Sequence, residues 1–331
     1  MKKLISLALA LMLVFSLATV AMAADVDSPE EEPVQVYTDQ STVTLTKVYK
    51  LVGAGSSPAE TFTVAQTGKR VVTGEATVAP DLGTITGAEF AAGAATADGA
   101  TGTITINLPT YTNVGIYEYT LQEVNTAATA GVTYRANSIR LVVSVINDEN
   151  GNIRVAYAHA EEEGSNTKSN TITNTYSAGT LKVSKTVDGN MGDKTKYFEF
   201  TVTLTGVNGK TYANSFPVSG GSTGGNNPTS ISLGTATKFN LKHGDTISIA
   251  NIPYGVSYQV VETAADGYTT VKTGDTGTIG SAEATAAFTN TKNGDVDTGI
   301  TLDSLPFVLI LAVCAGAVVL FVIKRRRSVD F

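Results

Sequence analysis

Short segments in which apolar and polar residues alternate recur along most of the chain. Residues 181–187 alternate as a β-strand does, except that Lys185 falls on the apolar side together with Val183. Lys47 breaks the alternation of residues 43–49 in the same way. An amine on the core-facing side of a strand must be paired, neutral or chemically consumed. These two lysines are therefore the first candidate functional residues.

Other alternating segments are rich in Thr, Val, Ile and Tyr and are separated by Gly, Asn and Asp, which predicts an all-β sandwich. The predicted strands include 61–64, 103–108, 115–124, 138–146, 153–158, 197–204, 246–252, 257–263 and 284–289. Residues 148–152 and 207–210 predict hairpin turns. The Ala- and Gly-rich residues 88–100 predict a short helix or a long loop.

The two halves of this region form a diverged repeat, with a boundary near residues 177–179. Each half opens with a strand ending in Thr/Ser-Lys, continues with a Phe-containing strand and a Tyr-containing strand ending in glutamate, and closes with Thr-Asn-Thr. The corresponding polar residues are Lys47, Glu123 and Asn174, then Lys185, Glu262 and Asn290, and the Phe-containing strands hold Phe62, then Phe198 and Phe200. The pattern predicts two tandem sandwich domains, residues 41–177 and 178–292.

Strand parity places the lysine, glutamate and asparagine of each half on the core-facing side. Burial lowers the pKa of a lysine amine, and a neutral amine is a nucleophile. A protonated carboxyl group donates to an asparagine carbonyl and makes it more electrophilic. Attack of the amine with loss of ammonia gives a Lys–Asn isopeptide bond once per molecule, so the chain is not an enzyme that turns over. The alternative is a pair of ordinary surface lysines beside a buried, hydrogen-bonded Glu/Asn pair.

The opening Thr/Ser-Lys strand, the Tyr-x-(Leu/Val)-x-Glu strand and the closing Thr-Asn-Thr resemble the isopeptide-forming domains of Gram-positive major pilins, of the two-domain streptococcal T-antigen type. The resemblance implies Ig-like sandwiches in which the opening lysine joins the closing asparagine and the glutamate is the catalyst. Carried over, the bonds are Lys47–Asn174 with Glu123, and Lys185–Asn290 with Glu262. In the first half Lys50 and Asn170 are competing positions, and parity favours Lys47.

Both ends of the chain carry membrane-related signals. Residues 1–23 have the charged start, apolar stretch and small-x-small end of a secretory signal peptide, and an acidic flexible leader follows at 24–40. Residues 305–323 are uncharged and long enough to span a membrane, and the basic tail 324–331 is expected to stay cytoplasmic. The net charge of −7 disfavours nucleic acid as a partner. The single cysteine, Cys314, lies in the span, so the exported body has no disulfide.

The resemblance also implies a sortase signal in the linker 293–304. Its residues are Val296, Asp297, Thr298 and Gly299, although the usual proline is missing. A sortase would cut after Thr298 and pass its carbonyl to an amine of peptidoglycan or of a neighbouring subunit. Lys168 is the candidate acceptor in a neighbouring subunit, with Lys182 as another.

The sequence therefore predicts a pilin or fimbrial subunit of a Gram-positive cell wall or pilus, which supports adhesion. The alternative is a non-polymerising wall- or membrane-anchored adhesin or stalk of the same fold. No metal or cofactor is expected, because the two histidines have no cysteine beside them and residues 220–225 lack the Gly-Lys-Ser/Thr of a phosphate loop.

Overall fold

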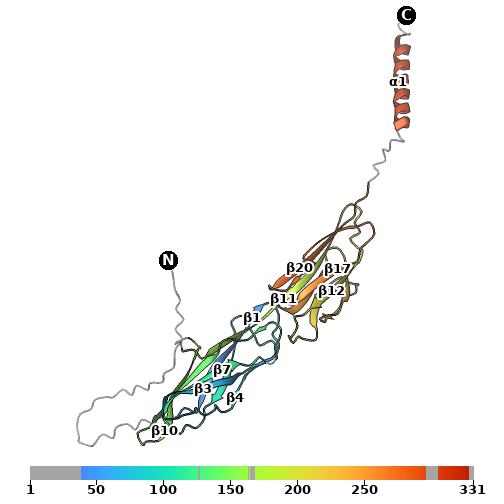
Figure 1. The fold of residues 1–331 in the computed structure, drawn as a ribbon. Helices are drawn as coiled ribbons and strands as arrows, with labels where there is room; N and C mark the ends of the chain where they lie inside the picture. Colours follow the sequence, from blue (N-terminus) through green and yellow to red (C-terminus); the bar gives the residue numbers. More distant parts are fainter. Residues whose placement is uncertain (1–38, 126, 163, 165–167, 296–304, 328–331) are drawn as a thin grey trace, which may run out of the picture. The chain divides into compact units, whose positions relative to one another are not determined.

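A computed structural model describes residues 39–125, 127–162, 164, 168–295 and 305–327. The predicted signal peptide 1–23, most of the leader 24–40 and the predicted sorting motif at 296–299 lie outside the described residues. Between Asp39 and Asp295 the described elements are strands, so the all-β prediction is confirmed (Figure 1).

Ten of the twenty strands precede residue 163: β1 (Thr42–Gly53), β2 (Glu60–Phe62), β3 (Val64–Gly74), β4 (Ile85–Thr86), β5 (Ala88–Phe90), β6 (Ala100–Asn107), β7 (Gly115–Glu123), β8 (Val132–Thr133), β9 (Ile139–Asn147) and β10 (Ile153–Glu162). The others are β11 (Thr171–Asp188), β12 (Phe198–Thr205), β13 (Phe216–Gly220), β14 (Ser230–Ile231), β15 (Thr237–Leu241), β16 (Thr246–Pro253), β17 (Ser257–Glu262), β18 (Thr269–Thr273), β19 (Thr276–Thr278) and β20 (Glu283–Thr291). One helix follows, α1 (Leu305–Arg327).

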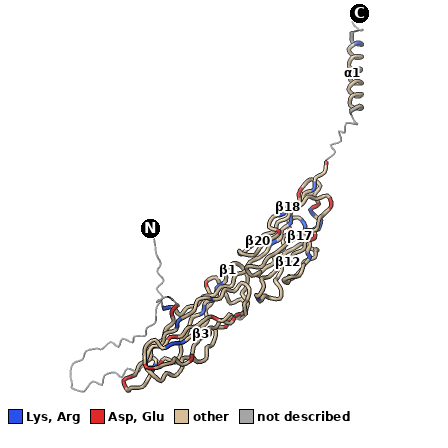
Figure 2. Tube along the Cα trace, in the orientation of Figure 1, with Lys and Arg blue, Asp and Glu red and all other residues tan. Residues whose placement is uncertain are grey.

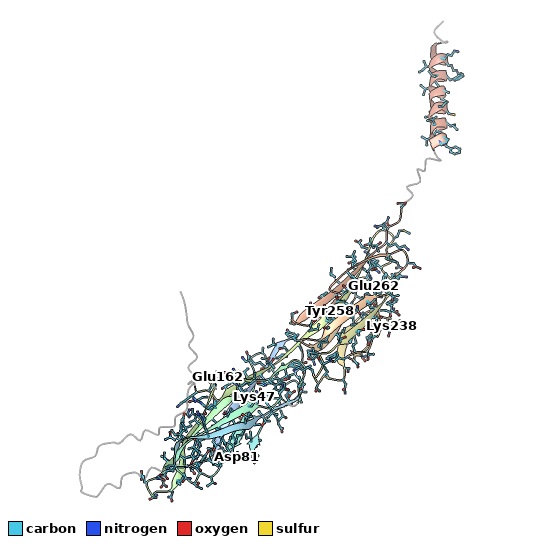
Figure 3. All side chains as sticks on the ribbon, in the orientation of Figure 1. Lys47, Asp81, Glu162, Lys238, Tyr258 and Glu262 are labelled. Atoms are coloured by element: carbon cyan, nitrogen blue, oxygen red, sulfur yellow. The ribbon has the colours of Figure 1, made fainter. Side chains whose placement is uncertain are left out.

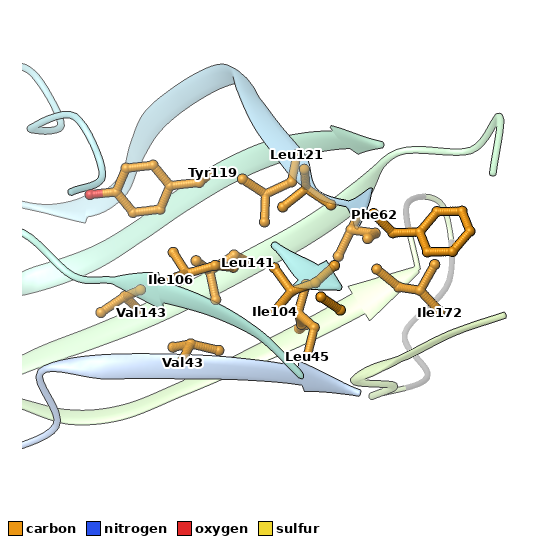
Figure 4. Close-up of a cluster of buried hydrophobic side chains, with 14 of the residues drawn as sticks. Val43, Leu45, Phe62, Ile104, Ile106, Tyr119, Leu121, Leu141, Val143 and Ile172 are labelled. Atoms are coloured by element: carbon orange, nitrogen blue, oxygen red, sulfur yellow. The ribbon is translucent and has the colours of Figure 1, made fainter. Parts of the chain in front are cut away.

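Two separate hydrophobic cores are each enclosed by two sheets. The first core lies between a sheet that contains β1, β6 and the start of β11 and the sheet β10-β9-β7-β3. Aliphatic side chains from both sheets interdigitate there, among them Leu45, Ile104, Leu121 and Leu141 (Figure 4). The second core lies between β16, the end of β11 and β20 on one side and the sheet β15-β12-β17-β19 on the other.

Strand β11 belongs to both cores. It runs without a break from Thr171 to Asp188, across the boundary expected near residues 177–179. Its first part pairs with β1 and its last part pairs with β20, and both pairings are parallel. The opening and closing strands of each half are therefore direct neighbours in one sheet.

Two local predictions differ from the structure, the first only in part. Residues 88–90 form β5, whose Ala88 and Phe90 are buried, whereas residues 91–99 lie in neither a strand nor a helix and fit the predicted loop. Residues 207–210 form a turn but not a hairpin, because β12 pairs with β15 and β17 while β13 pairs with β14 and β16. By contrast, the turn at 148–152 does join the antiparallel strands β9 and β10, as predicted.

Helix α1 contains the predicted membrane segment. Residues Pro306–Arg325 are long and apolar enough to cross a bilayer, and none of that stretch is buried in the protein. The helix continues beyond the predicted end at residue 323 into the basic residues. An exposed apolar helix of this length fits a membrane anchor.

Charged side chains are spread along both halves of the chain (Figure 2). Among the described residues, the buried charged side chains include only two lysines, Lys47 and Lys185, which are 0% and 1% exposed. These are the two lysines that break the alternation of their strands.

Candidate functional site

The first candidate site is a buried triad of amine, carboxylate and carboxamide. Lys47 Nζ donates hydrogen bonds to Glu123 Oε1 and, at 2.6 Å, to Asn174 Oδ1. Asn174 Nδ2 in turn donates to the two carboxylate oxygens of Glu123 at 2.9 and 3.0 Å. All three residues lie inside the first core, at most 5% exposed (Lys47 is labelled in Figure 3). The amine and the amide that would react are thus in contact, with the carboxylate touching both.

The second site repeats the contacts of the glutamate with the lysine and with the asparagine, but not the hydrogen bond between lysine and asparagine. Lys185 Nζ donates to both oxygens of Glu262, at 3.0 and 3.1 Å, and Asn290 Nδ2 donates to Glu262 Oε1 at 2.5 Å. The Glu262 side chain, labelled in Figure 3, is 3% exposed. Asn290 Oδ1 has no hydrogen-bond partner in the described part of the chain. The carbonyl group that the amine would attack is therefore buried and accepts no hydrogen bond from the described residues.

The strand register explains why the two sites match. Lys47 lies beside Ile172 on the parallel neighbour β11, and Asn174 is two residues further along the same face. Lys185 lies beside Phe288 on β20, and Asn290 is again two residues further. One offset between parallel strands thus brings each lysine to its asparagine.

The glutamates come from the facing sheets. Glu123 is the last residue of β7 and Glu262 is the last residue of β17. Each side chain points into the core because it shares its face with buried residues of its own strand, such as Leu121 and Val260. The end of a strand is a suitable position for the glutamate. From there the carboxylate reaches across the space between the sheets to the lysine of the opening strand and the asparagine of the closing strand.

An aromatic ring covers each amine. The ring centroid of Phe62 lies 4.5 Å from Lys47 Nζ, and that of Phe198 lies 4.4 Å from Lys185 Nζ. Desolvation by burial lowers the pKa of Lys47 to about 8, against the opposing influence of Glu123. Desolvation also lowers the pKa of Lys185. The sequence shows these phenylalanines as part of the repeat, but it gives them no role; the structure places them against the amines.

The first site has two contacts that the second lacks. One is the hydrogen bond from Lys47 to Asn174, and the other is on the glutamate. The backbone N–H of Arg135 donates to Glu123 Oε2 at 2.5 Å, and the Arg135 guanidinium pairs with Glu162 at 2.8 Å. Among the described residues, Glu262 receives hydrogen bonds only from Lys185 and Asn290. Sequence patterns could not reveal the Arg135 contact, because any residue type supplies a backbone N–H.

Comparisons with known proteins agree with this geometry. The family model described as Spy0128-like isopeptide containing domain matches residues 43–177, and a model described as a domain of unknown function (DUF7601) matches residues 179–292. A pilin of Streptococcus pyogenes serotype M1 is 29% identical over 237 residues, which are 66% of this chain and 69% of that protein. Residues 43–177 thus match the Spy0128-like isopeptide containing domains, and the chain is similar to a streptococcal pilin over 237 residues.

Two further similarities concern pilus proteins of the same organism. The pilus tip adhesin Cpa of Streptococcus pyogenes is 32% identical over 130 residues, which are 37% of this chain and 18% of the adhesin. The crystal structure of the major pilin from Streptococcus pyogenes is 26% identical, covers 78% of this chain and 100% of that chain, and has a TM-score of 0.49.

The competing positions lie outside the first triad. Lys50 is partly exposed and is paired with Thr175 on the neighbouring strand, while Asn170 is exposed. Lys168 is exposed at the edge of β10, where its Nζ donates to the Tyr157 hydroxyl at 3.3 Å. Lys182 is 40% exposed and pairs with Glu283 at 2.5 Å. Only Lys47, of the lysines on β1, contacts both an amide and a carboxylate.

We expect formation of the first bond to slow as the pH rises through about 8. Formation of the predicted bond requires a neutral amine together with a carboxyl group that donates, so the two groups must share one proton. That proton is lost near pH 8, the pKa of Lys47. The full chain is made in a cell-free system, held unfolded in urea and then diluted into buffers between about pH 6.5 and 9.5. Mass spectrometry follows the loss of ammonia and gives the rate of bond formation at each pH. A rate that climbs through pH 8 would contradict the shared-proton requirement.

Proposed function

We propose that this pilin is a self-crosslinked subunit of a surface fibre, with isopeptide bonds Lys47–Asn174 and Lys185–Asn290. The observation that carries the proposal is the repetition of one buried triad at the same register in both halves. Buried lysines and glutamates are rare unless they are paired, and in both halves an asparagine also donates to the glutamate of the pair. A structural ion pair alone does not require an asparagine at the same place twice.

The chemistry balances without any cofactor. The lysine nitrogen attacks Cγ of the asparagine, a new C–N bond forms, and the bond to the amide nitrogen breaks. The glutamate accepts a proton from the amine and delivers one to the departing nitrogen, which leaves as ammonia. Desolvation assists the first step, since it favours the neutral amine of Lys47.

Such bonds suit a structural protein. Each would join the opening strand of a half to its closing strand, which are parallel neighbours in one sheet. Tension applied at the ends of that pair would be carried by covalent bonds, and not by the hydrogen bonds of the sheet. Closing a loop of about 100 residues also stabilises a fold by about 4–5 kcal/mol in the loop-entropy model of crosslinks.

Assembly would follow export. A sortase would break the peptide bond between Thr298 and Gly299 and transfer the Thr298 carbonyl to Lys168 of a neighbouring copy, or to peptidoglycan. The position of Thr298 shortly before the apolar helix α1 supports this order of segments. The exposure of Lys168 supports its role as the acceptor amine, since an acceptor must be reachable by the enzyme.

The exported body is expected to weigh about 34 Da less than its sequence requires, because each bond releases one ammonia of about 17 Da. Intact-mass spectrometry of the purified body measures this directly. A body with the full mass of its sequence would overturn the crosslinks.

A denaturing gel of surface extracts is expected to show a ladder of covalent polymers. A single band with the mass deficit intact would instead favour the non-polymerising anchored protein.

A further inference from the structure

A clamp holds the chain just before the proposed sorting motif. Asn190 Nδ2 donates to the carbonyl of Gly294 at 2.8 Å, and the N–H of Gly294 donates to Asn190 Oδ1 at 2.9 Å. Backbone hydrogen bonds from Met191 to Lys292 and from Lys292 to Asp188 support the same segment. The loop after β11 therefore fixes the chain as far as Gly294, beyond the end of β20.

The clamp leaves a short tether. Thr298 is four positions after Gly294, and four residue steps span at most about 14 Å when fully extended. An extended lysine side chain adds about 6 Å. In a fibre joined from Thr298 to Lys168, Gly294 of one copy thus lies within about 20 Å of the Lys168 backbone of the next. A domain of 100 residues has a radius of gyration of about 13 Å, so the surfaces beside these two residues must face each other.

One exposed apolar side chain lies at each end of that tether. The Met191 side chain packs against Gly294, since a Cβ added there would lie 2.8 Å from Met191 Cγ, and Met191 is 57% exposed. Tyr157 is 46% exposed, and its ring centroid lies 4.9 Å from Lys168 Nζ. The ring also stacks on His159 at 5.0 Å, which limits its rotation. A thioether and a fixed aromatic ring form a favourable contact, typically about 0.3–1.5 kcal/mol.

We propose that neighbouring copies of this chain meet through Met191 of one copy and Tyr157 of the next. This inference rests on the proposed function, because it needs a bond from Thr298 to Lys168. The partner is a second copy of the chain, and the short tether selects these residues among the exposed apolar side chains. Asn190 acts as a positioning residue, because its amide keeps the tether short.

Cysteine trapping tests the contact. Cells that make the surface fibre co-express a Met191→Cys chain and a Tyr157→Cys chain, so that a disulfide between the two positions joins different copies. After oxidation with diamide, digestion and mass spectrometry are expected to find peptides 191 and 157 linked by a disulfide. The exported body has no cysteine of its own, so no native thiol competes. The control replaces Met191→Cys by Val261→Cys, which is 47% exposed on β17 and distant from the tether in sequence.

The outcomes separate the two proposals. A covalent ladder without the 191–157 disulfide, or with as much 261–157 disulfide, overturns the contact and leaves the fibre. A junction peptide that contains Lys182 in place of Lys168 overturns it as well. Absence of any ladder in the unmodified chain overturns the proposed polymer itself.

Asn190→Ala is expected to lower the yield of the 191–157 disulfide while the ladder persists, because the tether then lengthens. An unchanged disulfide yield removes the positioning role of Asn190.

Discussion

Replacing Lys185 by methionine is expected to restore about 17 Da to the exported body and to destabilise its second half by about 4–5 kcal/mol. The substitution keeps an unbranched side chain that is one atom shorter but removes the nucleophile, so Asn290 keeps its amide nitrogen. Loss of the crosslink frees the unfolded chain between β11 and β20. For a domain of about 100 residues this corresponds to a fall in Tm of roughly 20 °C or more, measurable by calorimetry.

The matched control is Lys182→Met, three residues earlier on the same strand. Lys182 is 40% exposed and pairs with Glu283 on the surface. Exposed pairs contribute at most about 1 kcal/mol, so this variant should keep the mass deficit and nearly all of its stability. Equal losses in the two variants would show that any lysine on β11 matters and would remove the special role of Lys185.

The sequence predicts the fold class and the inward direction of the triads for a simple physical reason. Alternation along one strand reports which face is buried, and Lys47 and Lys185 stand out because they share that face with aliphatic residues. The repeat then links each lysine to a glutamate and an asparagine of the same half. The structure confirms that these side chains face the cores.

The relation between the strands could not be predicted in this way. The parallel pairing of β1 with β11, and the offset of two residues that brings Asn174 to Lys47, depend on contacts between segments far apart in the chain. The boundary near residues 177–179 carries Ser-Ala-Gly, which suggests a linker, yet β11 continues there because its neighbours on both sides provide hydrogen bonds. Local composition does not contain that information.

The two departures from prediction have the same origin. Residues 88–100 lack a long alternating pattern, but Ala88 and Phe90 pair with β2 and close the first core beside Phe62. The turn at 207–210 has the residues of a hairpin, but the strands that it joins enter different sheets. In both cases the tertiary neighbours decide the outcome, and local propensity does not.

Replacing Phe198 by alanine is expected to slow the second crosslink and to destabilise the second core by about 3–5 kcal/mol. The ring lies against the Lys185 amine and keeps water away from it. Without the ring the amine is hydrated, its pKa returns toward the ordinary lysine value, and the neutral nucleophile becomes scarcer. The rate of ammonia loss during refolding from urea, followed by mass spectrometry, measures the effect, and Phe198→Leu should restore most of the rate because it keeps the site apolar.

Phe216→Ala separates the chemistry from the packing. Phe216 is equally buried in the same core, but the register of β13, β16 and β11 places it near Gly179, in the middle of β11 and six residues before Lys185. Removing the Phe216 ring should destabilise the second core by about as much as removing the Phe198 ring, because it leaves a cavity of similar size. We therefore expect Phe216→Ala to lose stability and keep its crosslinking rate, while Phe198→Ala loses both. If the two variants slow ammonia loss equally, the ring of Phe198 acts only as a packing residue, and desolvation of the amine by that ring is not what drives the reaction.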